Sequence, residues 1–321
     1  MSVLEVQDLK TYFFTRRGVI KAVDGVSFSL GEGEALGLVG ESGCGKSVTA
    51  LSIVKLLPRP AGKIVDGKIL FQGENLLEKT ENEMRSIRGK RIALILQDPM
   101  TSLNPAFTIG NQVAEPFKVH QGLKGSILWE KVTDILSLLR IPSPQARLGS
   151  YPHQMSGGMR QRVVGAIALS CVPNVLIADE PTTSLDVTIQ AQYLAVLKDI
   201  QKQSNTSLIF ITHDLGVVAK MCTRVAVMYA GRVVEIAPVK ELFAQPAHPY
   251  TVGLIRSLPK LGVKVKRLFS IEGQPPSLVN LPAGCRFAPR CGKATEICFA
   301  QYPPSAPLSA SHEVNCWWPE K

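Results

Sequence analysis

The sequence predicts an α/β fold in which short parallel strands carry chemically active residues to one edge of a sheet. The first observation is Gly40-Glu-Ser-Gly-Cys-Gly-Lys46-Ser47, a glycine-rich phosphate-binding loop, or P-loop. The second is a pair of apolar runs, 175–178 and 208–211, which end in Asp179-Glu180 and in Thr212-His213-Asp214. Ligands of open parallel sheets bind beyond the carboxyl ends of the strands, so we expect one common nucleotide site.

The P-loop has suitable flanking elements. Residues 35–39 form an apolar run typical of a buried strand, and residues 47–57 can form a helix that Pro58 and Pro60 should stop. Glycines let backbone N–H groups close around phosphates, and Lys46 can reach the outer phosphates. Cys44 is interpreted as a small tolerated residue. The candidate ATP-binding residues are Gly40, Ser42, Gly43, Cys44, Gly45, Lys46, Ser47 and Val48.

The residues after the two apolar runs suit magnesium-dependent hydrolysis. Magnesium prefers hard oxygen ligands, so we expect it at Ser47 and, through water, at Asp179. Glu180 has the position of the residue that orients or deprotonates the attacking water. For His213 we expect a contact to the γ-phosphate, although a lone histidine at a strand end is often only a structural residue.

Hydrophobic patterns predict the secondary structure of the rest of residues 1–235. Residues 1 to about 95 read as strands around the P-loop helix, with a hairpin turn at Arg16-Arg17-Gly18. From about 98 to 162 the pattern is helical, because 127–140 places Val132, Ile135, Leu136 and Leu139 at helical spacing. Residues from about 163 to 235 return to the α/β pattern.

Composition favours a cytosolic enzyme. The 321 residues are 45% hydrophobic and 19% charged, which allows a substantial core, and no signal peptide is expected. The most apolar stretch, 163–178, is shorter than a membrane span and is interrupted by Pro173-Asn174. The net charge of +10 is scattered over short clusters, so we expect no nucleic-acid partner.

After residue 240 prolines accumulate, which predicts a small appendage without long helices. Cys285, Cys291, Cys298 and Cys316 lie there with gaps of five, six and seventeen residues. In a reducing cytosol, clustered cysteines favour metal or cluster ligation over disulfides. The gaps exceed those common in structural zinc sites, so an iron–sulfur cluster, zinc and free buried thiols all stay open.

Five stretches carry a resemblance to a known family: Gln97-Asp-Pro-Met-Thr-Ser-Leu-Asn-Pro105, Tyr151-Pro-His-Gln-Met-Ser-Gly-Gly-Met-Arg-Gln-Arg162, Asp179-Glu-Pro-Thr-Thr-Ser-Leu-Asp186, His248-Pro-Tyr250 and Gly284-Cys-Arg-Phe-Ala-Pro-Arg-Cys291. The chain resembles the ATP-binding subunits of ABC importers, most closely the oligopeptide/dipeptide permease ATPases, which include nickel importers. Met159 departs from the general ABC signature but is similar to the peptide-importer branch.

The resemblance implies roles for several further residues. Gln97 would sense magnesium and the lytic water and link the site to the membrane partner. Ser156, Gly157 and Gly158 would form the signature that touches the γ-phosphate bound on an opposite subunit, and Asp186 would lie in a loop crossing that dimer interface. Phe13 would stack on adenine, with Tyr12 and Phe14 as neighbouring candidates.

The resemblance also implies the architecture and the function. We expect an ABC-type domain over 1–240, with a RecA-like core, an antiparallel β subdomain and a helical subdomain over about 98–162, followed by an extension over 241–321. The four cysteines would hold a structural 4Fe-4S cluster, and nucleotide affinity would not depend on it. We expect ATP-driven import of di- or oligopeptides, with nickel or another small solute as the alternative. A soluble ABC ATPase acting on nucleic acid or ribosomes is less favoured.

The partners expected from the resemblance lie at the membrane. They are two permease subunits, a second identical or homologous ATPase and, indirectly, an extracytoplasmic solute-binding protein. The chain would therefore act as a peripheral protein at the cytoplasmic face of the membrane.

Overall fold

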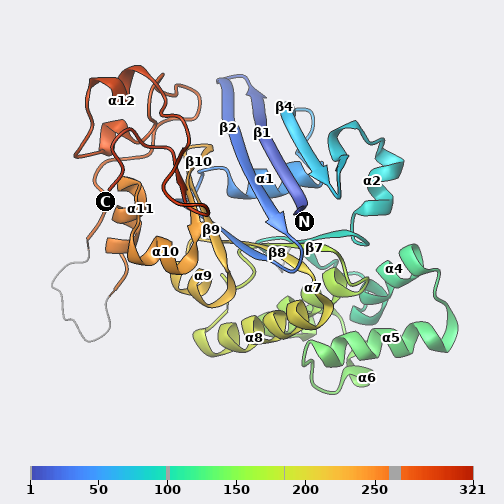
Figure 1. The fold of residues 1–321 in the computed structure, drawn as a ribbon. Coiled ribbons are helices and arrows are strands. Elements are labelled where there is room, and N and C mark those ends of the chain that lie inside the picture. Colours follow the sequence, from blue (N-terminus) through green and yellow to red (C-terminus); the bar gives the residue numbers. More distant parts are fainter. Residues whose placement is uncertain (1, 99–101, 184, 260–268, 321) are drawn as a thin grey trace. The chain divides into compact units, whose positions relative to one another are not determined.

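The computed structural model describes residues 2–98, 102–183, 185–259 and 269–320. The chain, whose ribbon is drawn in Figure 1, divides into two compact units. The helical unit comprises the described residues of 1–4, 30–35 and 70–211. The P-loop unit comprises the described residues of 5–29, 36–69 and 212–321.

The helical unit contains three parallel strands and a group of helices. Strand β7 pairs with β6 through Ile177 and Leu94, and with β8 through Ile177 and Ile209. All five residues of β7 are buried, as expected for a parallel strand covered on both faces. The helical unit contains the elements β5 (Glu74–Asn75), α2 (Glu81–Ile87), β6 (Ile92–Ile95), α4 (Ile109–Gln121), α5 (Gly125–Leu138), α6 (Pro144–Arg147), α7 (Gly157–Leu169), β7 (Val175–Asp179), α8 (Val187–Ser204) and β8 (Ser207–Thr212).

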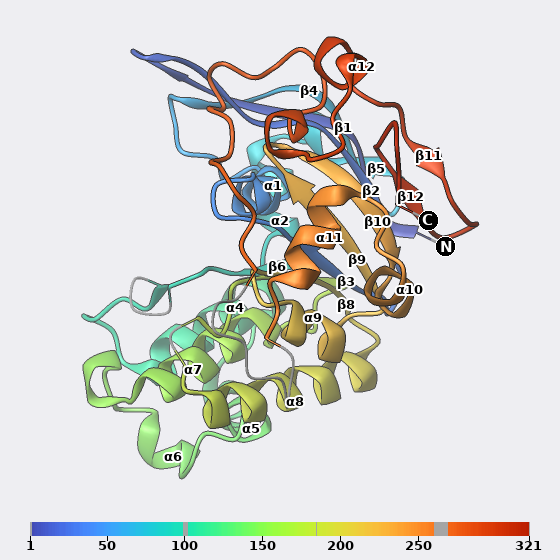
Figure 2. The same cartoon turned by 90° about the vertical axis from the view of Figure 1, so that its left-hand side faces the viewer.

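The region over about 98–162 contains helices α4, α5 and α6 and the first part of α7, which ends at Leu169, while its bounds as a subdomain stay a prediction. Helices α4, α5 and α7 pack on one another, as the green segments of Figure 2 show. Helix α5 begins at Gly125 and ends at Leu138, close to the predicted 127–140, and it buries Leu128, Val132 and Leu136. The apolar stripe of this helix is therefore ordinary packing, as the spacing predicted.

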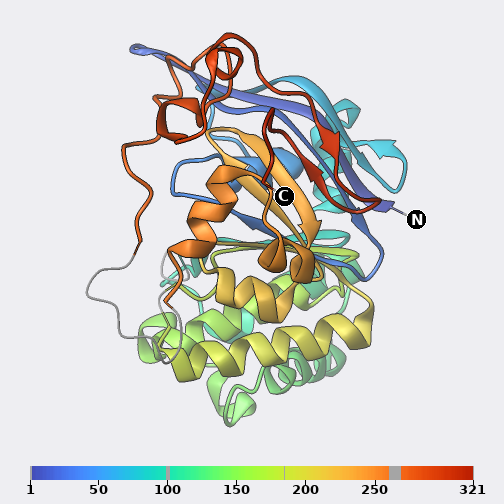
Figure 3. The same cartoon turned by 60° about the vertical axis from the view of Figure 1, so that its left-hand side comes forward.

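The P-loop unit combines an antiparallel sheet, in the order β2-β1-β4, with strands that continue from β3. Strand β3 pairs with β9 in parallel, and β9 pairs with β10 antiparallel. The hairpin of β11 and β12, drawn in red in Figure 3, adds to β10 through Val314 and Glu235. The P-loop unit contains most of β1 (Ser2–Thr15), β2 (Gly18–Gly31) and β4 (Gly62–Phe71), then β3 (Ala35–Val39), α1 (Lys46–Ile53), α9 (Leu215–Met221), β9 (Arg224–Tyr229), β10 (Arg232–Pro238), α10 (Val239–Ala244), α11 (Pro249–Arg256), α12 (Glu296–Ala300), β11 (Ala306–Pro307) and β12 (Glu313–Val314).

Most of the local predictions hold in this unit. The predicted strand at 35–39 is β3, and β1 and β2 are joined at the predicted hairpin turn. The predicted helix at 47–57 is shorter, because α1 ends at Ile53 and Lys55 adopts a left-handed φ of 53°. The helix thus stops before the prolines reach it. The division at residue 240 stays a prediction.

Candidate functional site

The P-loop connects β3 to α1 through six residues, and its backbone conformation requires glycine at two of them. Gly40 has a φ of 154°, and a Cβ atom there would lie 2.2 Å from the carbonyl oxygen of Met228. Gly45 has a φ of 106°, and its Cβ would lie 2.3 Å from the carbonyl oxygen of Ala22. Both positions exclude any side chain, so the two glycines fix the path of the loop.

Lys46 is the first residue of α1 and its side chain lies inside the loop. Its Nζ donates to the carbonyl oxygens of Gly40 at 2.8 Å and Glu41 at 3.1 Å. Ser47 follows in the first turn, where backbone N–H groups have no partner within the helix. This arrangement of N–H groups, hydroxyl and ammonium is suited to an anionic ligand.

The other loop residues differ in exposure. Ser42 and Gly43 are exposed, whereas Cys44 is buried. Burial raises the pKa of the Cys44 thiol, and the nearby charge of Lys46 only partly offsets this rise. The thiol is therefore protonated at neutral pH, in agreement with the interpretation of Cys44 as a small tolerated residue.

His213 belongs to the same unit as the P-loop. It directly follows β8, its side chain is exposed, and the next residue, Asp214, caps α9. The Asp214 carboxylate accepts from the N–H groups of Gly216 at 2.8 Å and Val217 at 3.2 Å. The position of His213 is therefore fixed by a helix start, while its contact to a phosphate stays a prediction.

In the helical unit, the structure brings Gln97 and Glu180 together. Gln97 Nε2 donates to Glu180 Oε2 at 3.0 Å, and the hydroxyl of Thr183 donates to the same oxygen at 2.9 Å. Asp179 is the buried last residue of β7, directly before Glu180. Sequence reasoning proposed Gln97 and Glu180 separately but missed Thr183, which lies only three residues after Glu180.

Glu180 has a strained backbone. Its φ is 46°, a left-handed value that costs a residue with a side chain on the order of 1 kcal/mol. The conformation is held by a hydrogen bond from the Glu180 N–H to the carbonyl oxygen of Ile211, at 2.9 Å. Strain of this kind is typical of functional positions, where it aims a side chain that regular structure would direct elsewhere.

The signature residues lie at a helix start. Ser156 is the N-cap of α7, and its hydroxyl accepts from the N–H of Met159 at 3.3 Å. A Cβ at Gly158 would lie 2.7 Å from Cγ2 of Ile189, so glycine permits close packing against α8. Asp186 caps α8 and accepts from the N–H of Ile189 at 3.0 Å. Sequence reasoning missed this capping role, and the roles of these residues in a dimer stay predictions.

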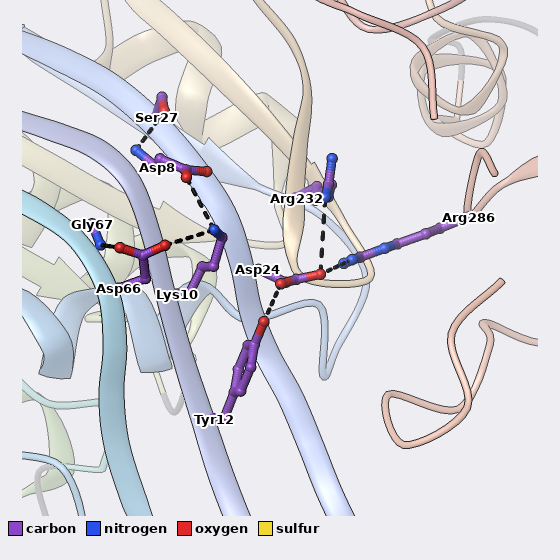
Figure 4. Close-up of polar contacts among 9 residues, drawn as sticks. All are labelled: Asp8, Lys10, Tyr12, Asp24, Ser27, Asp66, Gly67, Arg232 and Arg286. Atoms are coloured by element: carbon purple, nitrogen blue, oxygen red, sulfur yellow. Dashed lines mark hydrogen bonds and ion pairs between the residues drawn. The ribbon is translucent and has the colours of Figure 1, made fainter. Parts of the chain in front are cut away.

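The three aromatic candidates for the adenine have different surroundings. The Tyr12 hydroxyl donates to Asp24, as Figure 4 shows. Burial and this hydrogen bond raise the pKa of Tyr12 to about 12. Phe13 packs beside Gly62, and Phe14 is 47% exposed with Lys63 over its ring. The three residues remain candidates, with Phe13 as the predicted one.

The four C-terminal cysteines gather around one cavity of about 20 Å³. Burial raises the pKa of the Cys285 and Cys291 thiols, and raises that of Cys316 to about 11. Within the part of the chain that the structure describes, no group of three or more His, Cys, Asp or Glu side chains is arranged to hold a metal ion. The structure therefore supports the gathering of the cysteines but not the predicted cluster.

Among the residues that the structure describes, no helix is both long enough and apolar enough to cross a membrane.

Comparison with known proteins gives the family. The model of the ABC transporter family matches residues 23–183, and that of the oligopeptide/dipeptide transporter C-terminal region matches residues 234–298. The dipeptide transport ATP-binding protein DppD of Bacillus subtilis is 52% identical, over 98% of this chain and 94% of its own length. The oligopeptide transport ATP-binding protein AppD of the same organism is 48% identical, over 98% of this chain and 96% of its own length.

Solved structures agree with this result. The dimeric structure of MJ0796, a bacterial ABC transporter cassette, matches with a TM-score of 0.66 and 24% identity, over 74% of this chain and 98% of that one. At this identity the likeness shows the fold alone. The chain belongs to the ABC transporter family and has its α/β P-loop ATPase fold. Within that family it is an ABC-type ATPase that also carries the C-terminal region of oligopeptide/dipeptide transporters.

Proposed function

We propose that this chain is the ATP-hydrolysing subunit that energises the import of dipeptides or oligopeptides through separate permease subunits. The observation that carries the proposal is the presence, in one chain, of a match to the ABC transporter family and a match to the C-terminal region of oligopeptide/dipeptide transporters. Relatives named for dipeptide and oligopeptide transport are about half identical over nearly the whole chain. Nickel or another small solute is the alternative cargo.

The site residues would divide the work of hydrolysis. The P-loop N–H groups and Lys46 would bind the phosphates, and His213 would contact the γ-phosphate. The hydroxyl of Ser47 and the carboxylate of Asp179 are hard oxygen donors that fit magnesium, which supplies charge neutralisation at the phosphates. Glu180, held by Gln97 and Thr183, would orient the attacking water and take its proton.

Two candidate anion sites, the P-loop and the start of α7, support a dimer of ATPases. The start of α7 at Ser156 presents N–H groups and a positive dipole end that favour a phosphate. We propose that Ser156, Gly157 and Gly158 of one subunit contact ATP bound to the P-loop of another, with Asp186 at the interface. The second subunit would be a copy of this chain or a related ATPase, and the complex would lie at the cytoplasmic face of the membrane.

Transport itself can be tested in the source cells. A strain lacking this chain should lose uptake of labelled dipeptides and tripeptides but retain uptake of free amino acids. Wild-type protein should restore peptide uptake, whereas the Glu180→Gln variant should not. Loss of nickel uptake with normal peptide uptake would instead support the alternative cargo.

The gathering of four thiols around one cavity supports a metal or cluster site there. Cys thiolates are the usual ligands of iron–sulfur clusters. The cavity itself has room for about one water molecule, so side chains would have to move outwards to admit a cluster. We propose a 4Fe-4S cluster held by Cys285, Cys291, Cys298 and Cys316, with zinc as the alternative.

Replacing Cys291 by serine tests this site. Protein purified without oxygen should contain iron and sulfide, and Cys291→Ser should lose most of both, because serine replaces one of the four thiolate ligands. Metal analysis by mass spectrometry measures the change. Cys171→Ser is the matched control, since Cys171 does not line the cavity. Zinc in place of iron would support the alternative, and equal iron in both variants would reject the site.

A further inference from the structure

One residue of the P-loop, Glu41, is held by the C-terminal part of the chain. Its N–H donates to the hydroxyl of Tyr250 at 2.8 Å. Its carboxylate accepts two bonds from Arg290, with Nη1 to Oε2 at 2.9 Å and Nη2 to Oε1 at 3.1 Å. A planar guanidinium that binds both oxygens of a carboxylate fixes direction as well as distance. Both the backbone and the side chain of Glu41 are thus fixed from outside the loop.

Arg290 is itself immobilised. Its Nε donates to the carbonyl oxygen of Glu272 at 2.9 Å, Nη2 to that of Ile271 at 3.3 Å, and Nη1 to the Tyr229 hydroxyl at 3.1 Å. Together with the bonds to Glu41, these contacts occupy the five donors of the guanidinium. The side chain is only 6% exposed. Arg290 therefore acts as a rigid support for Glu41.

The segment that carries Arg290 is packed against the same region. The ring of Phe287 lies 5.3 Å from that of Tyr229 and 5.5 Å from that of Tyr250, and the two tyrosine rings are 4.6 Å apart. Tyr229 and Tyr250 are almost fully buried. Offset and tilted aromatic contacts of this kind add directional stability to a packed core.

A second arginine of the same segment holds strand β2. Arg286 forms an ion pair with Asp24 (Figure 4). It also donates to the carbonyl oxygen of Ala230. Asp24 also accepts from Tyr12 and lies 3.9 Å from Arg232. Burial would raise the pKa of Asp24, but the Tyr12 bond and the two arginine charges hold it below the usual range. The carboxylate therefore stays charged at neutral pH and links the segment to Tyr12.

We propose that the segment Cys285–Cys291 positions the nucleotide site, with Arg290 and Tyr250 as positioning residues for the P-loop. The carbonyl oxygen of Glu41 accepts from Lys46, so a shift of Glu41 displaces the lysine that is to reach the phosphates. The proposal rests on the P-loop binding ATP, and not on the cargo. Cys285 and Cys291 are the first and last residues of this segment. The proposal therefore reverses the expectation that nucleotide affinity is independent of the cysteine region.

A double-mutant cycle between Glu41 and Arg290 tests the proposal in the full-length protein. Arg290→Ala and Glu41→Ala should each weaken ATP binding about tenfold, measured by calorimetry, because the loop loses its fixed position. The double variant should bind no more weakly than either single variant, since both remove one shared interaction. ATP affinity should change more than kcat. Arg256→Ala, an exposed arginine on α11, should bind ATP as wild type does.

A more conservative variant separates the proposed effect on the P-loop from an effect of unfolding. Tyr250→Phe removes only the hydroxyl that accepts from the Glu41 N–H, so it should keep the aromatic packing and still weaken ATP binding about threefold. Wild-type affinity in both Arg290→Ala and Tyr250→Phe, or additive effects of Glu41→Ala and Arg290→Ala, would overturn the proposal. Absence of ATP binding by the wild-type protein would instead reject the proposed ATPase.

Discussion

Replacing Glu180 by glutamine should stop ATP turnover while leaving ATP binding intact. The glutamine oxygen can still accept the bonds that Gln97 and Thr183 donate to Glu180 Oε2, so the local geometry should persist. An amide cannot accept a proton from water, and loss of a general base costs about 10²- to 10⁴-fold in rate. Steady-state phosphate release measures the loss, and ATP affinity measured in parallel should stay within about twofold of wild type.

The same variant should accumulate as an ATP-bound dimer. If ATP bridges two subunits, blocked hydrolysis keeps the bridge intact, and gel filtration with ATP should show a larger species than with ADP. Glu130→Gln, on the exposed side of α5, is the matched control and should hydrolyse ATP normally. Brisk hydrolysis by Glu180→Gln would show that another residue handles the water.

Replacing Lys46 by alanine should have the second largest effect. Its buried ammonium lies within the loop at 2.8 Å from the Gly40 carbonyl oxygen, and it is the only lysine of the P-loop. Loss of charge-assisted bonds to phosphate costs about 1.5–3 kcal/mol each, so ATP affinity should fall about 100-fold or more. Calorimetric titration with ATP measures the change.

The control for this variant is Lys68→Ala, an exposed lysine of β4 in the same unit. It should leave ATP affinity unchanged. Thermal unfolding should show that both variants remain folded, so that a weaker affinity reports the lost ammonium. Unaltered affinity in Lys46→Ala would mean that the loop binds phosphate through its backbone alone.

Local patterns in the sequence predicted the parts of the fold that depend on local chemistry. The run at 35–39 became β3, and the apolar run before Asp179 became β7, because both are short, apolar and bounded by turns. The end of α1 was predicted too late. Ile53 ends the helix because the chain turns at Lys55 with a left-handed φ, which the downstream prolines do not reveal.

The long-range contacts could not be predicted from one sequence. Arg290 and Glu41 are 249 positions apart, and Arg286 and Asp24 are 262 apart. A charged residue in a sequence gives no signal of its partner, since most charged residues are solvated. The capping of α8 by Asp186 was locally readable, because an aspartate before a helical run is a typical N-cap.

The sequence predicted that the four cysteines form a common site, but it did not determine what occupies that site. Their number and their proline-rich surroundings predicted a common site, and all four do line one cavity. The occupant of that site depends on side-chain geometry and on oxidation state, which residue spacing alone does not determine. Residue spacing also does not determine which of Tyr12, Phe13 and Phe14 stacks on adenine. Adjacent strand residues alternate between the two faces of a sheet, so the three side chains do not share one face.

The most direct test of the importer function is to purify the tagged full-length chain gently from its native membranes and identify the proteins that accompany it. We expect two polytopic permease subunits, with a second ATPase and a solute-binding protein where the complex is complete. Recovery only from the soluble fraction, together with nucleic acid or ribosomes, would contradict the transport function and leave the ATPase site to be explained by another partner.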